Sequence, residues 1–171
     1  MIRVCPSCGA GLESNAGETR HDRYNSSPEC WEKFGELSAY TLSHGDPKFI
    51  HQHAVDTWQL QHAVLSKSNI GIAFSLIGLY LALEQGFTGR QVQLAHMELG
   101  RTKRNWGAFE IPESLATLTV VDVLRADPGP ARDAVLMQWA ASVWANWNHA
   151  HVWTRQTCAK LLRSHFTGSS T

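Results

Sequence analysis

The stretch that decides the fold is Ser27 to His62, SPECWEKFGELSAYTLSHGDPKFIHQHAVDTWQLQH. It begins with Ser-Pro-Glu at positions 27–29, which combines a capping hydroxyl, a proline in the first turn and an acid near the positive end of a helix. Asp-Pro at positions 46–47 repeats this start signal after a short break. The sequence therefore predicts two antiparallel helices, over 28–43 and 47–64, joined by a tight turn.

The spacing within the second predicted helix determines which side chains can act together. Four side chains follow one another at intervals of 4, 3 and 4 residues: His51, Val55, Trp58 and His62. They form one stripe, but eleven residues separate His51 from His62, which is about 16 Å along a helix and too far for one shared metal ion. In an antiparallel hairpin, His62 lies beside Cys30 at the start of the first helix, and His51 lies at the opposite end.

Two cysteines, Cys5 and Cys8, lie near the beginning of the chain in the sequence CPSCG. The rest of residues 1–26 is polar and glycine-containing, without helical or strand periodicity, and has too little apolar area to order itself. A Cys-Pro-x-Cys-Gly turn directs two thiolates at one point and is half of a zinc knuckle. We therefore expect residues 1–26 to be a metal-knuckle leader that zinc holds in place.

The knuckle needs two more ligands. Cys30 is the best third ligand, because a helix N-terminus favours its thiolate. For the fourth ligand, two candidates stay open: His62, which the hairpin brings to Cys30, and His21, which is closer in sequence. The alternative is that Cys5 and Cys8 are free thiols, although a redox CxxC pair normally opens a helix after a strand.

The remaining patterns predict further helices. Asn69 to Gln85 is apolar on almost all sides, as in the central helix of a bundle. The other predicted segments are a helix from the Thr88/Gln91 capping box to about Arg104, a loop over 105–118 with Trp106 and Phe109, a short helix capped by Thr119 and Asp122, and a long helix over 131–163. The sequence thus predicts an all-α, five- to six-helix up-and-down bundle over 27–166, forming one structural domain with the leader, and a disordered tail over 167–171.

Three polar side chains fall inside the predicted bundle: His51, Glu84 and His151. Two interpretations stay open. In the first, His151 is hydrogen-bonded in the core and Arg155 pairs with Asp56 or Glu84. In the second, His51, Glu84 and His151 bind an interior metal ion that activates water or a thiol.

Composition excludes several classes of function. Acidic and basic residues balance at 15 each, which argues against a nucleic-acid or anionic-membrane partner. The first residues lack the apolar run of a signal peptide, and the longest apolar segment, 70–83, is too short to span a bilayer. We expect a cytoplasmic protein, and in that reducing compartment four cysteines indicate metal binding rather than disulfides.

Five segments together resemble the bacterial family catalogued as domain of unknown function 5946: CPSCG, SSPECWEKFGEL, HQHAVDTWQLQH, SLIGLYLALEQG and VWANWNHAHVWTR. The resemblance covers most of the chain and implies the metal and the helical architecture, but no reaction. The chain departs from the family pattern at Ser75, where the pattern has histidine, at Ala63, where it has proline, and at 149–151, where it has adjacent histidines. An interior metal site that used the position of Ser75 would be altered or lost here.

The leading hypothesis is a zinc-binding helical protein of unassigned activity, with a structural zinc ion held by Cys5, Cys8, Cys30 and either His62 or His21. One alternative is a metal-dependent enzyme, a hydrolase or transferase, that uses the interior histidine and glutamate residues. Another is a protein-interaction module that docks through Trp106 and Phe109. A homo-oligomer, a protein partner and the identity of any small-molecule substrate stay open.

Overall fold

The computed structural model describes residues 1–14 and 24–162. Helix accounts for 59 % of the structure, so the predicted all-α class is confirmed. The elements in this part of the chain are β1 (Ile2–Val4), β2 (Gly11–Glu13), α1 (Pro28–Ser43), α2 (His51–Gln61), α3 (Ile70–Glu84), α4 (Gly89–Gly100), α5 (Val120–Arg125), α6 (Pro130–Asn146), the 3-10 turn η1 (Asn148–Ala150) and α7 (His151–Leu161). His21 and the expected tail over 167–171 lie outside the described residues.

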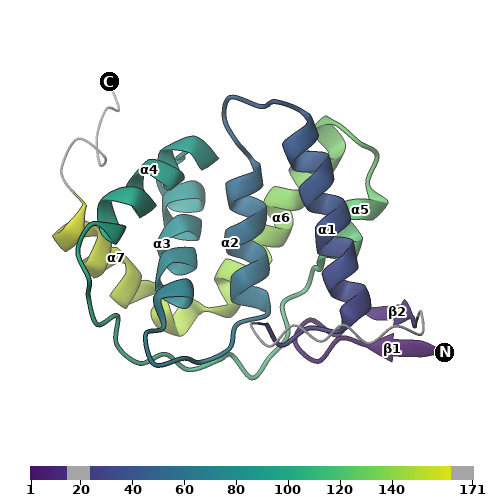
Figure 1. Ribbon diagram of the computed structural model, residues 1–171, viewed down its shortest axis with the longest axis horizontal. Helices are drawn as coiled ribbons and strands as arrows, with labels where there is room; N and C mark the ends of the chain where they lie inside the picture. Colours follow the sequence, from purple (N-terminus) through teal and green to yellow (C-terminus); the bar gives the residue numbers. More distant parts are fainter. Residues whose placement is uncertain (15–23, 163–171) are drawn as a thin grey trace.

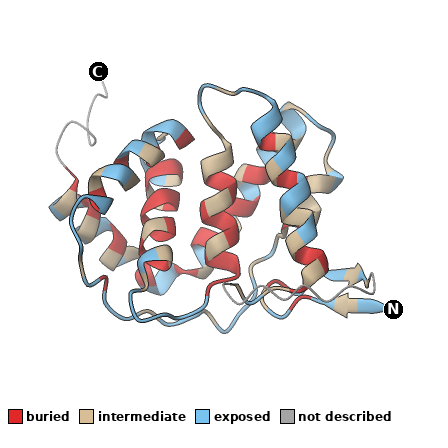
Figure 2. Cartoon of the chain, viewed as in Figure 1, coloured by how far each residue is buried: buried red, intermediate tan, exposed pale blue. Residues whose placement is uncertain are grey.

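The helices are arranged around α2 and α3 (Figure 1). α2 contacts α1, α3, α4 and α6, while α3 also contacts α7. The small sheet lies at the end of the molecule where α1 begins and α2 ends (Figure 1). Buried residues concentrate on α2 and α3 (Figure 2), so these two helices form the middle of the fold.

Helix α1 has the predicted bounds because its start signal is local. The backbone N–H of Cys30 donates to the Ser27 hydroxyl over 3.2 Å, and Pro28 occupies the first turn. Leu37 and Thr41 are buried on the face that packs inward. The cap and the apolar face agree, and together they place Cys30 in the first turn of α1.

Helix α2 begins at His51, so the prediction that it starts at residue 47 was wrong. The carboxylate of Asp46 accepts hydrogen bonds from the backbone N–H groups of Lys48 and Ile50 and closes a turn instead of capping a helix. Phe49 then has a φ of 57°, which a helix does not allow. Its carbonyl oxygen lies so close to Gly89 of α4 that a Cβ there would collide with it, so contact with α4 sets the start of α2.

The long final helix predicted over 131–163 is two helices. The chain leaves α6 at Trp147, which has φ −93° and ψ 26°, passes through η1 and begins α7 at His151. The Trp147 side chain is only 1 % exposed. The bend lets α6 pack on α2 and α5 while α7 packs on α3.

The first 13 residues form a β-hairpin that the sequence did not predict. β1 and β2 are antiparallel, with Ile2 opposite Glu13 and Val4 opposite Gly11. Strands of three residues are too short to reveal an alternating pattern. Arg3 on β1 lies 3.4 Å from Glu29 in the first turn of α1, so an ion pair joins the hairpin to that helix.

Buried apolar residues form two clusters. The first joins α1, α2, α5 and α6 with the cysteines of the hairpin, and the second lies among α3, α4 and α7. Helix α3 contributes to both clusters, through Leu76 and Leu79 on one face and through Ile77 and Leu81 on another. Within the described residues, no helix has the length and apolar character needed to cross a membrane.

Candidate metal centre

Four side chains that could bind a metal meet at the base of the α1–α2 hairpin. Their ligand atoms, from Cys5, Cys8, Cys30 and His62, all lie within 4.8 Å of one another. Each of the four residues is at most 4 % exposed. No other group of three or more histidine, cysteine or acidic ligand atoms comes so close together within residues 1–14 and 24–162.

Cys30 lies between the ligands from the leader and the ligand from α2. Its Sγ is 3.6 Å from the Sγ of Cys8 and 3.6 Å from the Nε2 of His62. The end of α2 therefore meets the start of α1, as the antiparallel arrangement of the two predicted helices requires. The cluster joins three segments: the turn between β1 and β2, the first turn of α1 and the residue that follows α2.

The backbone of the CPSCG turn positions the first two sulfurs. The N–H of Gly9 donates to the carbonyl of Cys5 over 3.0 Å, and the N–H of Cys5 donates to the carbonyl of Ala10 over 2.9 Å. Gly9 has a φ of 74°, in the left-handed region that glycine adopts without strain. A Cβ at Gly9 would also lie 2.9 Å from the side chain of Leu115, so this position favours glycine for two reasons.

The orientation of His62 is set by Trp58, one turn earlier. The Nδ1 atom of His62 lies 3.0 Å from the carbonyl oxygen of Trp58, and the two rings stack with their centroids 3.7 Å apart. Because a carbonyl oxygen can only accept, Nδ1 carries the proton and Nε2 presents a lone pair toward Cys30. This is the usual second-shell arrangement of a histidine that ligates a metal through Nε2.

The three thiols perturb one another strongly. Contacts with Cys30 and Cys8 lower the pKa of Cys5, whereas contacts with Cys5 and Cys8, together with burial, raise the pKa of Cys30. Contact with Cys30 lowers the pKa of Cys8, but contact with Cys5, together with burial, outweighs this effect and raises the pKa of Cys8 to about 12. Without a metal ion, the surrounding groups favour ionisation of only one of the three cysteines. A divalent cation bound to the sulfurs would favour the thiolate form of all three.

Comparison with known proteins places the chain in a family. Residues 3–148 match the family of unknown function DUF5946. The chain belongs to this family. The matched range contains all four side chains of the cluster, so the cluster lies in the part of the chain that the DUF5946 match covers. No curated protein and no solved structure matches the chain, so membership of DUF5946 brings no activity with it.

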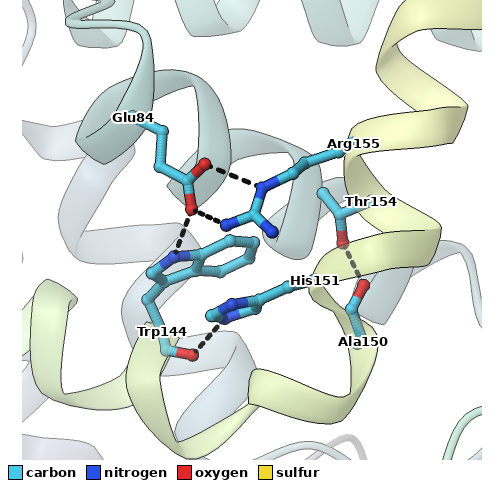
Figure 3. Close-up of polar contacts among 6 residues, drawn as sticks. All are labelled: Glu84, Trp144, Ala150, His151, Thr154 and Arg155. Carbon is cyan, nitrogen blue, oxygen red and sulfur yellow. Dashed lines mark hydrogen bonds and ion pairs between the residues drawn. The ribbon is translucent and has the colours of Figure 1, made fainter.

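Glu84 and His151, two of the interior candidates in this DUF5946 protein, lie near each other but have other partners (Figure 3). The Glu84 carboxylate accepts from Arg155 over 2.7 Å and from the indole N–H of Trp144 over 3.1 Å. The hydrogen bonds from Arg155 lower the pKa of Glu84. His151 stacks on Trp144 at 3.8 Å and its Nε2 is 2.9 Å from the Trp144 carbonyl oxygen. The partners match the interpretation in which His151 is hydrogen-bonded and Arg155 pairs with an acid, here Glu84 rather than Asp56, but Glu84 and Arg155 are exposed, so the pair lies at the surface and not in the core.

The other sequence candidates also have structural partners. The Nδ1 of His51 lies 2.8 Å from the Thr41 hydroxyl, so His51 contacts α1. Trp106 is 5 % exposed and belongs to the second apolar cluster, and the ring of Phe109 packs edge-on against Trp153. Within the described residues, the ligand atoms of His51, Glu84 and His151 do not form a close group.

Sequence reasoning missed a second buried polar group between α2 and α3. Asp56, which is 2 % exposed, was considered only as a partner of Arg155, and Gln59 and Ser75 were not considered as its neighbours. The signal was available in α3, where Ser75 and Gly78 interrupt an otherwise apolar helix. A small and a polar residue three positions apart indicate that a polar group of another helix approaches closely.

Proposed function

We propose that this DUF5946 protein binds one zinc ion through Cys5, Cys8, Cys30 and His62, and that the ion is structural. The observation that supports the proposal best is the convergence of four buried ligand atoms, within 4.8 Å of one another, from three separate segments of the chain. The residues fit the ion, because a set of three thiolates and one imidazole in so small a volume has few other physical explanations.

The donor set favours zinc over other divalent ions. Thiolate sulfur is a soft ligand that selects zinc or copper(I) and binds magnesium and calcium poorly. Three cysteines with one histidine are one of the common structural zinc sets, and they satisfy tetrahedral coordination. The three thiols and the imidazole of this cluster correspond to that set.

Complete burial favours a structural over a catalytic role. Four protein ligands fill the tetrahedral shell, so no position remains for water or a substrate. Cys30 and His62 are 0 % exposed, and Cys5 and Cys8 are 1 % and 4 % exposed. An ion at this place would fix the β-hairpin to the ends of α1 and α2 and would supply the order that the polar leader lacks.

The environment of the protein follows from the same chemistry. All four cysteines are unbridged and buried. We propose a cytoplasmic location, because cytosolic reductants keep thiols unbridged and three thiols are needed for the zinc site.

Metal analysis of matched cysteine variants tests the proposal. Protein purified without added metal should contain about one zinc ion per chain, Cys30→Ser should contain none, and Cys158→Ser should keep the wild-type content. Cys158 is a fair control because it is also buried, at 2 % exposure, but lies in the second apolar cluster. Zinc-free wild-type protein, or Cys30→Ser with unchanged zinc, would contradict the proposal.

A second pair of variants identifies the fourth ligand. His62→Ala should lose the zinc or hold it weakly enough for a mild chelator to remove it. His21→Ala should keep the zinc against the same chelator. The reverse result would assign the fourth position to His21, and unchanged zinc in both variants would leave a site of three cysteines.

A further inference from the structure

Two buried polar side chains, Asp56 and Ser75, and the half-buried Gln59 form a hydrogen-bonded chain between α2 and α3. The hydroxyl oxygen of Ser75 on α3 lies 3.5 Å from Oδ1 of Asp56 and 3.2 Å from Oε1 of Gln59, which are both on α2. Gln52, one turn before Asp56, donates its Nε2 to the same Oδ1 over 3.1 Å. Ser75 therefore stands between the acid and the Gln59 amide.

Asp56 is enclosed by protein on all sides. It is 2 % exposed, and its second oxygen, Oδ2, has no hydrogen-bond partner in the described part of the chain. Oδ2 lies against Gly78 of α3, where an added Cβ would collide with it, and His96 of α4 presents a ring carbon to the same spot. An ionised carboxylate in such a place is costly, because nothing compensates half of its charge.

The hydrogen bonds that link Asp56, Ser75 and Gln59 can be arranged in two ways, depending on whether Asp56 carries a proton. Ser75 has one hydroxyl proton and two nearby acceptors. If Asp56 holds a proton, it donates to Ser75, Ser75 donates to Oε1 of Gln59, and the Gln59 NH₂ group points away. If Asp56 is ionised, Ser75 must donate to Asp56, and Gln59 completes the chain only by turning its NH₂ group toward Ser75.

The charges around Asp56 favour the protonated arrangement. Burial raises the pKa of Asp56 well above its usual value, against the opposing effect of the hydrogen bonds from Gln52 and Ser75. The titratable neighbours are His96 on α4 and His53 one turn earlier on α2, and burial lowers the pKa of each to about 4. Both histidines are therefore neutral above pH 5, while Ser75 and Gly78 on α3 carry no charge.

Gln59 connects this chain to a cavity. A cavity of about 520 Å³ lies where α2 ends and α3 begins, and its lining residues include Gln59, Gly71 and residues 63–66. The Nε2 of Gln59 lies beside Gly71, close enough that a side chain at position 71 would displace it. The Oε1 atom of Gln59 thus contacts Ser75, and its Nε2 atom lies at the cavity wall beside Gly71.

We propose that the proton on Asp56 sets the orientation of the Gln59 amide, so that the cavity wall offers a hydrogen-bond donor when Asp56 is neutral and an acceptor when it is ionised. Ser75 transmits the change, because its single proton goes to one neighbour or the other. Asp56, Ser75 and Gln59 are not members of the metal cluster, and the change makes the cavity selective for different ligand groups at different pH.

Nuclear magnetic resonance of the full chain between pH 5 and 10 tests the proposal. The side-chain carboxyl carbon of Asp56 reports its proton directly, and the side-chain NH₂ signals of Gln59 report the amide. In the wild type, both sets of signals should change in one step with the same midpoint. The His96→Gln variant should keep this shared transition, because His96 only contacts the carboxyl group.

Two variants separate the coupling from simple proximity. Ser75→Ala should keep a transition at Asp56 but remove the transition at Gln59, and Asp56→Asn should remove the transition at Gln59. An Asp56 carbon signal that shows no step between pH 5 and 10 would overturn the proposal. So would a Gln59 signal that ignores the Asp56 midpoint, or one that follows it unchanged in Ser75→Ala.

Discussion

A single carboxyl group illustrates how one residue affects the stability of the whole protein. Asp56 is buried between α2 and α3, and one of its oxygens has no hydrogen-bond partner among residues 1–14 and 24–162. Burying a polar group without a partner costs about 1–3 kcal/mol, and ionising it costs more. Asp56 is therefore a residue that the fold tolerates at the expense of stability.

Replacing this carboxyl group should change how stability depends on pH. Burial raises the pKa of Asp56 in the folded protein well above its usual value of 3.8. Between about pH 4 and the folded pKa, only the unfolded chain releases the proton, so the contribution of Asp56 falls by about 1.4 kcal/mol per pH unit. Asp56→Asn should therefore gain stability relative to the wild type from pH 5 to pH 8 in urea unfolding.

The same substitution at an exposed acid is the control for this pH series. Asp127 is exposed in the turn before α6, so Asp127→Asn should follow the wild-type pH dependence. An Asp56→Asn variant whose stability difference from the wild type stays constant from pH 5 to pH 8 would show that Asp56 ionises normally.

Two helical glycines should respond in opposite directions to alanine. At Gly78, a Cβ would collide with the carboxylate of Asp56, so Gly78→Ala should destabilise the protein by about 1–3 kcal/mol, as overpacking does. At Gly35 on α1 nothing lies within 4 Å, so Gly35→Ala should stabilise it by about 0.5–1 kcal/mol through helix propensity. Chemical denaturation measures both, and equal effects would mean that α2 and α3 do not pack this closely.

At the scale of elements, local signals predicted α1 and the capping boxes of α4 and α5. They failed where a contact between elements decides the structure. Asp46 with Pro47 suits a helix start and a turn equally well, and the proximity of Phe49 to Gly89 selects the turn. The break at Trp147 has neither glycine nor proline, and follows from α6 and α7 packing on different partners.

The candidate metal cluster was more predictable than the buried Asp56 chain for the same reason. The start of α1, the end of α2 and the antiparallel arrangement of the two helices suffice to bring Cys30 to His62. The contact of Ser75 with Asp56 depends on the rotation of α3 against α2. Because α3 is apolar on nearly every side, only Ser75 and Gly78 mark the face that meets α2, and they do not identify Asp56 as the partner.

Removing the metal should loosen the β1–β2 hairpin before it loosens α3. Under our proposal, a zinc chelator releases the turn between β1 and β2, so the N–H groups of Cys5 and Gly9, which bond within that turn, should exchange with solvent much faster. Amides of α3 in the second apolar cluster should change less, because that cluster contains no residue of the leader. Hydrogen exchange followed by mass spectrometry measures both regions, and unchanged exchange in the hairpin would contradict the structural role.

At the scale of the whole molecule, zinc should raise the melting temperature by an amount that grows with the logarithm of its free concentration. A ligand that binds only the folded state at a hundred times its Kd stabilises it by about 2.7 kcal/mol. For a chain of 171 residues, each kcal/mol shifts Tm by about 2–4 °C. Scanning calorimetry in zinc buffers measures this shift. Magnesium is the control, because thiolates bind it poorly.

The position of the four-residue cluster along the chain has a consequence for synthesis. Its last member, His62, precedes α3 and everything that follows. A growing polypeptide can therefore assemble all four side chains once residue 62 has left the ribosome, while α3 and the later helices have not yet emerged. Loading of the ion and formation of the first helical pair can then be one early event, on which the later helices build.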